Sequence, residues 1–200
     1  GSTVVVITRG DSAVGAIALS DTLRATSARA IQELTALGLT PILASGDHDV
    51  VAQHVAKAVG VDRVFSAMTP EGKATLITEL QSQGHTVAMV GDGINDAPGL
   101  ATADVGIAMG SGSDAAMTAG DITIVQGDIL AVSDGIRLSR RTLRTIQANL
   151  FWAFAYNVAA IPLAMAGLLN PLLAGLAMAL SSVFVVSNSL RLRRFRPTTQ

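Results

Sequence analysis

The chain has 200 residues, of which 50% are apolar, a mean hydropathy of +0.48 and a formal net charge of -1. This composition is too apolar for an ordinary soluble domain and favours membrane-spanning segments. Cysteine is absent from the sequence, which excludes disulfides and thiolate metal sites within this chain.

The first two thirds of the chain predict an α/β fold. Residues 3–8 and 13–19 are apolar or β-branched runs separated by Arg9-Gly10-Asp11, the pattern of a hairpin. A helix capped at Ser27 is expected to end just before Gly38. Another starts at Thr69-Pro70, with Pro70 in its first turn, and runs to Gln83, and further helices are expected over 49–59 and 114–119. Buried strands are expected over 39–44, 85–90, 104–109 and 122–125. Strands alternating with crossover helices predict a mostly parallel sheet with helices on both faces.

The last third predicts a membrane hairpin. An amphipathic helix from Ile129 leads to a first span at about 149–169, and a second follows at about 172–190 after Asn170-Pro171. Arginines lie on both flanks, at 137, 140, 141 and 144 and at 191, 193, 194 and 196. They predict cytoplasmic ends for both spans. Arginines beside a long uncharged run fit membrane orientation and anionic lipid better than nucleic acid, so no nucleic-acid partner is expected.

The start of the chain has neither an initiator Met nor the pattern of a signal peptide. It enters a β-like run at once, from which we expect a chain cut from something longer.

The strongest chemical signal is the Gly-rich stretch from Val90 to Pro98, at the carboxyl end of a predicted strand. Asp92 and Asp96 can offer oxygens to Mg²⁺. The phosphate-binding part of this loop would be Gly91, Gly93 and Asn95, because glycines let backbone N–H groups approach a phosphate. The alternative is a solvated turn with a helix-capping Asp.

Two weaker signals precede this loop. The tripeptide Ser45-Gly46-Asp47 follows another predicted strand, so its hydroxyl and amides can meet the same phosphate, although turns favour these residues anyway. Lys73 lies in the first turn of the helix after Pro70, where an ammonium can neutralise a transferring phosphoryl group. Most single helical lysines are simply solvated.

Taken in order, Ser45, Lys73 and the Asp92/Asp96 loop match three of the four motifs of haloacid-dehalogenase-like phosphotransferases. Together with Asp21-Thr22-Leu23-Arg24, the chain resembles the end of the phosphorylation domain of a heavy-metal P-type ATPase. The departures are mild: Ser45 stands where many members have Thr, and Gly99 where Ala is frequent.

The resemblance implies the roles of these residues. Asp92 would coordinate Mg²⁺ with Asp96 ligating or hydrogen-bonding nearby, Lys73 would stabilise a phosphoaspartate, and Ser45, with Gly46 and Asp47 completing its loop, would bind the phosphoryl oxygens. The aspartate that accepts the γ-phosphate of ATP, in Asp-Lys-Thr-Gly-Thr, is absent from this sequence. Most of the ATP site would also lie outside it, and we expect the chain alone to be inactive.

The implied division of the chain is a return from the nucleotide-binding domain (1–20), the phosphorylation domain (21–128), a connecting helix (129–148), the membrane hairpin (149–190) and a basic cytoplasmic tail (191–200).

Polar groups within the predicted spans point to a transported metal. The first span carries Tyr156-Asn157, and the second carries Met178, Ser181 and Ser182 on one helical face. A thioether suits Cu(I), whereas the alternative is ordinary helix packing. The pattern is similar to the last two helices of copper-transporting members, which implies Cu(I) as the substrate.

Three functions remain open at this point. The first is part of a Cu(I) export pump of the cell membrane, working with an N-terminal part that carries the nucleophile. The second is an inactive two-span accessory protein or truncated copy. The third is a membrane-anchored phosphatase that uses Asp47.

Overall fold

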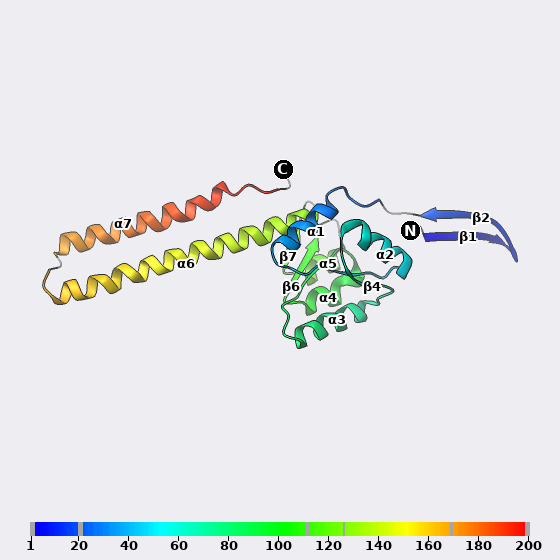
Figure 1. Ribbon diagram of the computed structural model, residues 1–200, viewed down its shortest axis with the longest axis horizontal. Helices are drawn as coiled ribbons and strands as arrows, with labels where there is room; N and C mark the ends of the chain where they lie inside the picture. Colours follow the sequence, from blue (N-terminus) through cyan, green and yellow to red (C-terminus); the bar gives the residue numbers. More distant parts are fainter. Residues whose placement is uncertain (1–2, 20–21, 111–112, 126, 169, 199–200) are drawn as a thin grey trace. The chain divides into compact units, whose positions relative to one another are not determined.

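The computed structural model describes residues 3–19, 22–110, 113–125, 127–168 and 170–198. They fall into two compact units, Gly1–Ser133 and Asp134–Gln200 (Figure 1). Asp21 and Leu169, which carried a predicted boundary and a predicted span end, lie outside the described residues.

The first unit begins with the predicted hairpin. Strands β1 (Thr3–Arg9) and β2 (Ser12–Leu19) pair antiparallel, and Gly10 at the turn has a φ of +61°. A left-handed turn residue of this kind favours glycine, because it has no Cβ to clash with the backbone.

The rest of the unit alternates helices and short strands. In chain order these are α1 (Ser27–Ala36), β3 (Ile42–Ala44), α2 (Asp49–Val59), β4 (Arg63–Phe65), α3 (Pro70–Ser82), β5 (Ala88–Gly91), η1 (Ile94–Asp96), α4 (Ala97–Thr102), β6 (Val105–Met109), α5 (Asp114–Ala119) and β7 (Ile122–Ile124).

The strands after the hairpin pair in parallel, which confirms the α/β class. They form two separate ladders, β3-β4 and β5-β6-β7. Among the described residues, β3 pairs only with β4 and β5 only with β6, so each strand has an unpaired edge. The carboxyl ends of both strands carry predicted site residues.

Each ladder has its own core. Ala56 and Val59 of α2 pack with Val61 and with Leu43 and Val64 of the first ladder. In the second, Leu100 of α4, Ala108 of β6 and Ala116 of α5 are buried together, with Met89 of β5 against them.

Helix α4 approaches β5 closely at Gly99. A methyl group at position 99 would lie 2.4 Å from the sulfur of Met89. The glycine therefore makes room for the longer methionine side chain, because close-packed interiors leave no space for both.

Several predicted elements need correction. Thr26, not Ser27, is the N-cap of α1, and its side chain makes no cap hydrogen bond. Strand β3 starts at Ile42, directly after Pro41, which has no backbone N–H to donate to a ladder. Strand β4 and the η1–α4 segment were not predicted at all.

The second unit holds most of α6 (Leu130–Met165), with α7 (Pro171–Leu190) and η2 (Arg191–Arg194). Both long helices are long and apolar enough to cross a membrane, by length and composition. The predicted connecting helix and first span form one continuous helix. It ends at Met165 and not at residue 169, and Gly167 follows with a φ of +71°.

Candidate active site

The loop after β5 is shaped by a glycine and an aspartate. Gly91 is buried, and a methyl group there would lie 2.6 Å from Cβ of Asp96. Only glycine therefore lets the chain fold back so that the Asp96 side chain lies against the end of β5.

Asp96 is engaged at both carboxylate oxygens. Its Oδ1 accepts a hydrogen bond from Nζ of Lys73 at 2.7 Å, and its Oδ2 accepts from the backbone N–H groups of Asp92 (3.2 Å) and Gly93 (3.1 Å). Burial alone would raise the pKa of Asp96. The hydrogen bond from Lys73, the Gly93 N–H, the Lys73 charge and the Asp92 N–H outweigh it, so the pKa lies below its ordinary value of 3.8.

Asp92 differs from Asp96 although the two lie on the same loop. Its side chain is exposed, and no other described residue donates a hydrogen bond to its carboxylate or forms an ion pair with it. Its backbone carbonyl accepts from the N–H of Ser113 at 2.8 Å, which ties this loop to the one after β6. A fixed backbone and a free carboxylate suit Mg²⁺, a hard cation that prefers oxygen ligands.

Lys73 is positioned by the start of α3. Thr69 caps this helix by accepting from the N–H of Gly72 at 3.1 Å, and Pro70 takes the first helical position. The side chains of Lys73 and Asp96 are only 12% and 13% exposed. Asp96 therefore holds the ammonium of Lys73 at the loop after β5.

The Ser45 loop is closed on itself. The hydroxyl of Ser45 donates to the Asp47 carboxylate at 2.9 Å, while the backbone N–H of Asp47 donates to that hydroxyl oxygen at 3.1 Å. Gly46 and Asp47 are exposed. The loop's hydroxyl and amides are thus held at the carboxyl end of β3.

The segment after β4 braces the Ser45 loop. The N–H of Ala67 donates to the carbonyl of Asp47 at 2.8 Å, and that of Met68 donates to the carbonyl of Ser45 at 3.0 Å. Ala67 has a φ of +50°, the only positive value at a non-glycine among the described residues. Because this segment runs directly into Thr69, it supports both the Ser45 loop and the helix that carries Lys73.

The structure thus joins Lys73 to the Asp92/Asp96 loop directly and to the Ser45 loop through residues 66–69. Asn95 is exposed within η1. Its side chain forms no hydrogen bond with another described residue, so the geometry does not indicate a role for it. The sequence interpretation correctly placed Thr69-Pro70 at the start of α3. It missed Ala67 and Ser113, which nothing local marked.

The predicted metal residues of the second unit divide into two groups. Tyr156 of α6 and Ser181 of α7 are half-buried, while Asn157, Met178 and Ser182 are exposed, Met178 to 64%. The amide of Asn157 donates to the Ala153 carbonyl at 2.6 Å, and the hydroxyl of Ser182 donates to the Met178 carbonyl at 3.1 Å. These side chains do not form a closed site within this unit.

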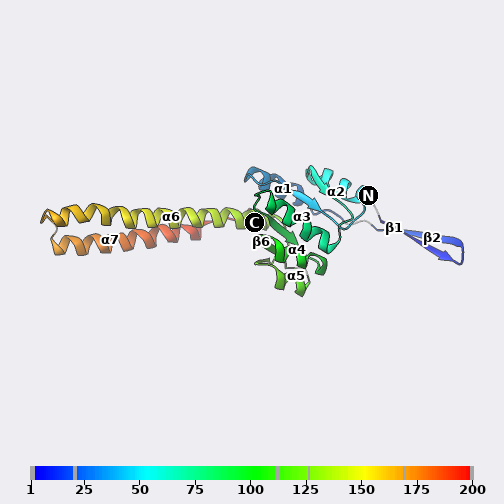
Figure 2. The same cartoon turned by 90° about the horizontal axis from the view of Figure 1, so that it is seen from below.

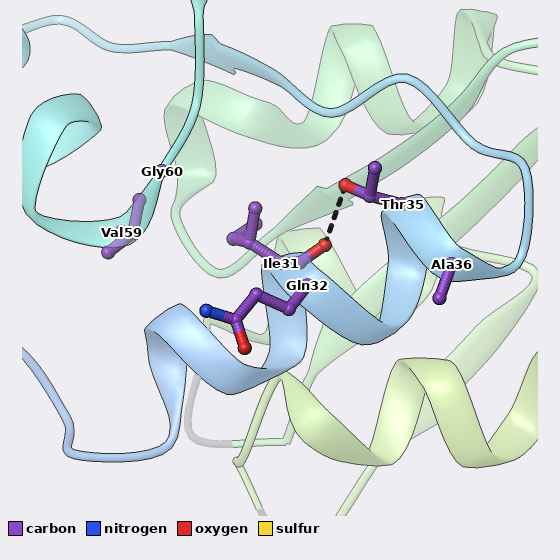
Figure 3. Close-up of a pocket in the computed structure, with 6 residues that line it drawn as sticks. All are labelled: Ile31, Gln32, Thr35, Ala36, Val59 and Gly60. Atoms are coloured by element: carbon purple, nitrogen blue, oxygen red, sulfur yellow. Dashed lines mark hydrogen bonds between the residues drawn. The ribbon is translucent and has the colours of Figure 1, made fainter.

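A groove of about 430 Å³ lies elsewhere, between α1 and the end of α2. Its lining residues are Ile31, Gln32, Thr35, Ala36, Val59 and Gly60 (Figure 3). It contains none of the predicted site residues, and its lining offers no charged side chain. The groove is therefore separate from the candidate site at the strand ends.

Comparison with known proteins identifies the family of the chain. The model of the haloacid dehalogenase-like hydrolase family matches residues 2–104. A copper-exporting P-type ATPase of Staphylococcus haemolyticus is 52% identical over 98% of the chain, and the cation-transporting P-type ATPase B of Mycobacterium leprae is 53% identical over 98%. The chain spans 25% and 26% of their lengths.

A solved structure of a related pump has a similar fold. The crystal structure of a zinc-transporting PIB-type ATPase in the E2.Pi state superimposes with a TM-score of 0.85 and is 39% identical. The match covers 97% of this chain and 32% of the other.

Proposed function

Because the chain belongs to the haloacid dehalogenase-like hydrolases and matches heavy-metal P-type ATPases over nearly its whole length, we propose that it works as the C-terminal part of an ATP-driven Cu(I) export pump. The pump would work through an aspartyl-phosphate intermediate. One observation carries this proposal: the two aspartates of the loop differ. The carboxylate of Asp92 is exposed and has no partner among the described residues, whereas the carboxylate of Asp96 binds Lys73.

The phosphoryl group would be received at the carboxyl ends of β3 and β5. Ser45, supported by Gly46 and Asp47, binds the phosphoryl oxygens, and the ammonium of Lys73 neutralises their charge. Asp92 would hold Mg²⁺, whose positive charge would offset the negative charge of the phosphate. Asp96 keeps Lys73 in place. Its carboxylate oxygens could also ligate the Mg²⁺ ion or accept a hydrogen bond from a water bound to that ion.

The nucleophilic aspartate comes from another part of the pump. Support comes from the unpaired edges of β3 and β5, whose carboxyl ends already carry Ser45 and Asp92. A parallel strand added at these edges would end beside both loops, because parallel strands present their carboxyl ends at the same side of a sheet.

The transported ion would bind to the second unit together with helices from the rest of the pump. We assign Tyr156 and Asn157 of α6 and Met178, Ser181 and Ser182 of α7 to this site. Three of the five are exposed on their helices, as residues that complete a site with other helices would be. The thioether of Met178 favours Cu(I), and the sequence offers no carboxylate between 150 and 190.

The pump would lie in the cell membrane with the first unit and both ends of the hairpin in the cytoplasm. The arginines at 137, 140, 141 and 144 and at 191, 193, 194 and 196 support this orientation, since positive residues stay inside and attract anionic lipid.

The phosphorylation step is tested with Asp92→Asn in the complete pump. We expect phosphoenzyme formation from ATP to be lost, because the Mg²⁺ ligand is lost while the loop keeps its hydrogen bonds. Asp114→Asn, in the first turn of α5, is the control and should keep phosphorylation. Normal phosphorylation of Asp92→Asn would overturn the assignment.

The transport site is tested with Met178→Leu. We expect weaker activation by Cu(I) and unchanged phosphorylation from inorganic phosphate, which needs the phosphate site and the nucleophile supplied by the rest of the pump but not Met178. Met165→Leu, an exposed methionine at the end of α6, is the matched control. Equal Cu(I) activation in both variants would show that Met178 is not a Cu(I) ligand and serves only in helix packing.

A further inference from the structure

Three polar side chains connect α6 and α7 at the start of the first predicted span and the end of the second. The amide nitrogen of Asn188 donates to the amide oxygen of Asn149 at 2.7 Å, and that of Asn149 donates to the hydroxyl of Ser189 at 3.1 Å. Neither the phosphate site nor the metal site uses these residues. We call them the amide clamp.

A second contact between the helices lies about one turn further along α6. The rings of Trp152 and Phe184 meet edge to face with centroids 6.4 Å apart. Ala153 of α6 and Val185 of α7, each next in sequence to one of these rings, are half-buried. The two helices lie side by side in both views (Figures 1 and 2).

The clamp fixes the depth of the metal residues. The helices run antiparallel, so counting forward along α6 and backward along α7 moves in the same direction. Asn157 lies eight residues after Asn149, and Ser181 lies eight residues before Ser189. At 1.5 Å per residue both lie about 12 Å from the clamp, and Tyr156 and Ser182 correspond one residue earlier.

This correspondence depends on the register between the helices. Apolar contacts slide with little loss, because lipid tails are as apolar as the side chains they replace. Hydrogen bonds between amides and a hydroxyl do not slide, since each donor needs its own acceptor. A shift by one turn would separate Asn157 from Ser181 by about 5 Å in depth.

We propose that Asn149, Asn188 and Ser189 are positioning residues that set the register of α6 and α7 and so bring Tyr156 and Asn157 of α6 to the depth of Ser182 and Ser181 of α7. The effect on Cu(I) rests on the proposed function. The register itself does not.

The experiment uses the complete pump with Asn149→Leu, which removes both hydrogen bonds. Gln147→Leu is the matched control: it removes an amide two residues away that bonds to no described residue. The double variant Asn149→Ser with Ser189→Asn restores an amide–hydroxyl pair and serves as the rescue.

The first readout is a cross-link between cysteines introduced at Ala153 and Val185, formed with a short thiol-specific reagent. We expect its yield to fall in Asn149→Leu and to recover in the exchange variant. The second readout is the Cu(I) concentration for half-maximal phosphorylation. It should rise roughly three- to tenfold in Asn149→Leu, as expected for two interhelical hydrogen bonds in a membrane.

Cross-linking in Asn149→Leu equal to that in Gln147→Leu would overturn the proposal, whatever the metal. A normal Cu(I) response despite lost cross-linking would overturn its link to ion binding. If phosphorylation of the unsubstituted pump did not depend on Cu(I), the proposed function would be refuted instead. The cross-linking yield would still decide whether the clamp sets the register.

Discussion

The hydrogen bonds of Asp96 make a quantitative prediction for Asp96→Asn. The substitution removes the charge opposite Lys73, whose Nζ lies 2.7 Å from Oδ1, and both side chains are nearly buried. A hydrogen bond between charged groups contributes about 1.5–3 kcal/mol. Removing one partner of a buried pair costs about 3–5 kcal/mol. Because both groups keep some access to water and Asn retains one acceptor, we expect a loss of about 2–3 kcal/mol.

The loss should appear as faster opening of the loop after β5. Hydrogen–deuterium exchange in the complete pump follows the N–H groups of Asp92 and Gly93, which donate to Asp96. At about 1.4 kcal/mol per tenfold change, their exchange should accelerate roughly 30- to 150-fold.

Asp92→Asn is the control in the same loop. It removes a carboxylate with no partner among the described residues, so exchange should change by no more than about twofold. If Asp96→Asn changed exchange as little as Asp92→Asn, the account of Asp96 as the residue that holds this loop and Lys73 together would be refuted.

Three further predictions concern the same loops. The pKa of Asp96 is lowered in the folded state, so its stabilisation is present above about pH 4 and is lost as the pH falls below it. The protection of the loop amides, which compares their exchange with that of an unstructured chain at the same pH, should therefore fall there, and this fall should be missing in Asp96→Asn. Gly91→Ala places a methyl group 2.6 Å from Cβ of Asp96. It should destabilise the loop by about 1–3 kcal/mol and lower phosphorylation, whereas Gly15→Ala in β2, where a methyl group would meet no atom within 4 Å, should leave phosphorylation unchanged. Thr69→Ala removes the cap of α3, and it should cost about 1 kcal/mol and accelerate exchange at the start of α3, while Thr69→Ser should not.

Local signals predicted the longer elements well. Helix α2 has the expected bounds, Asp49–Val59, and Gly60 follows with a φ of +82°. Helix α3 starts at Pro70 as expected. In both cases the residues that begin or end the helix act within one turn of it, so the sequence alone contains the information.

Two short segments were beyond this reasoning. Strand β4 has three residues, Arg63–Phe65, too few to show an alternation. It exists because β3 lies beside it in parallel, with Leu43 paired to Val64. The η1–α4 segment begins inside the Gly-rich loop, whose composition favours a turn.

The two loop aspartates could not be distinguished from the sequence. Asp92 and Asp96 have equivalent surroundings in the chain, and both were expected near Mg²⁺. Their difference arises from Lys73, which precedes Asp96 by 23 residues and reaches it only in the fold. The choice of residue types was therefore predictable, while the role of each one depends on tertiary contacts.

The close approach of α4 to β5 has a consequence for how related sequences diverge. Gly99 and the Met89 side chain share one space, in which a methyl group at 99 would meet the sulfur at 2.4 Å. Where a relative carries alanine at position 99, the side chain at position 89 must be shorter or turn away. Substitutions at these two positions should therefore be accepted in pairs during evolution. The change at position 89 should come first, because alanine at position 99 beside an unchanged Met89 would be overcrowded.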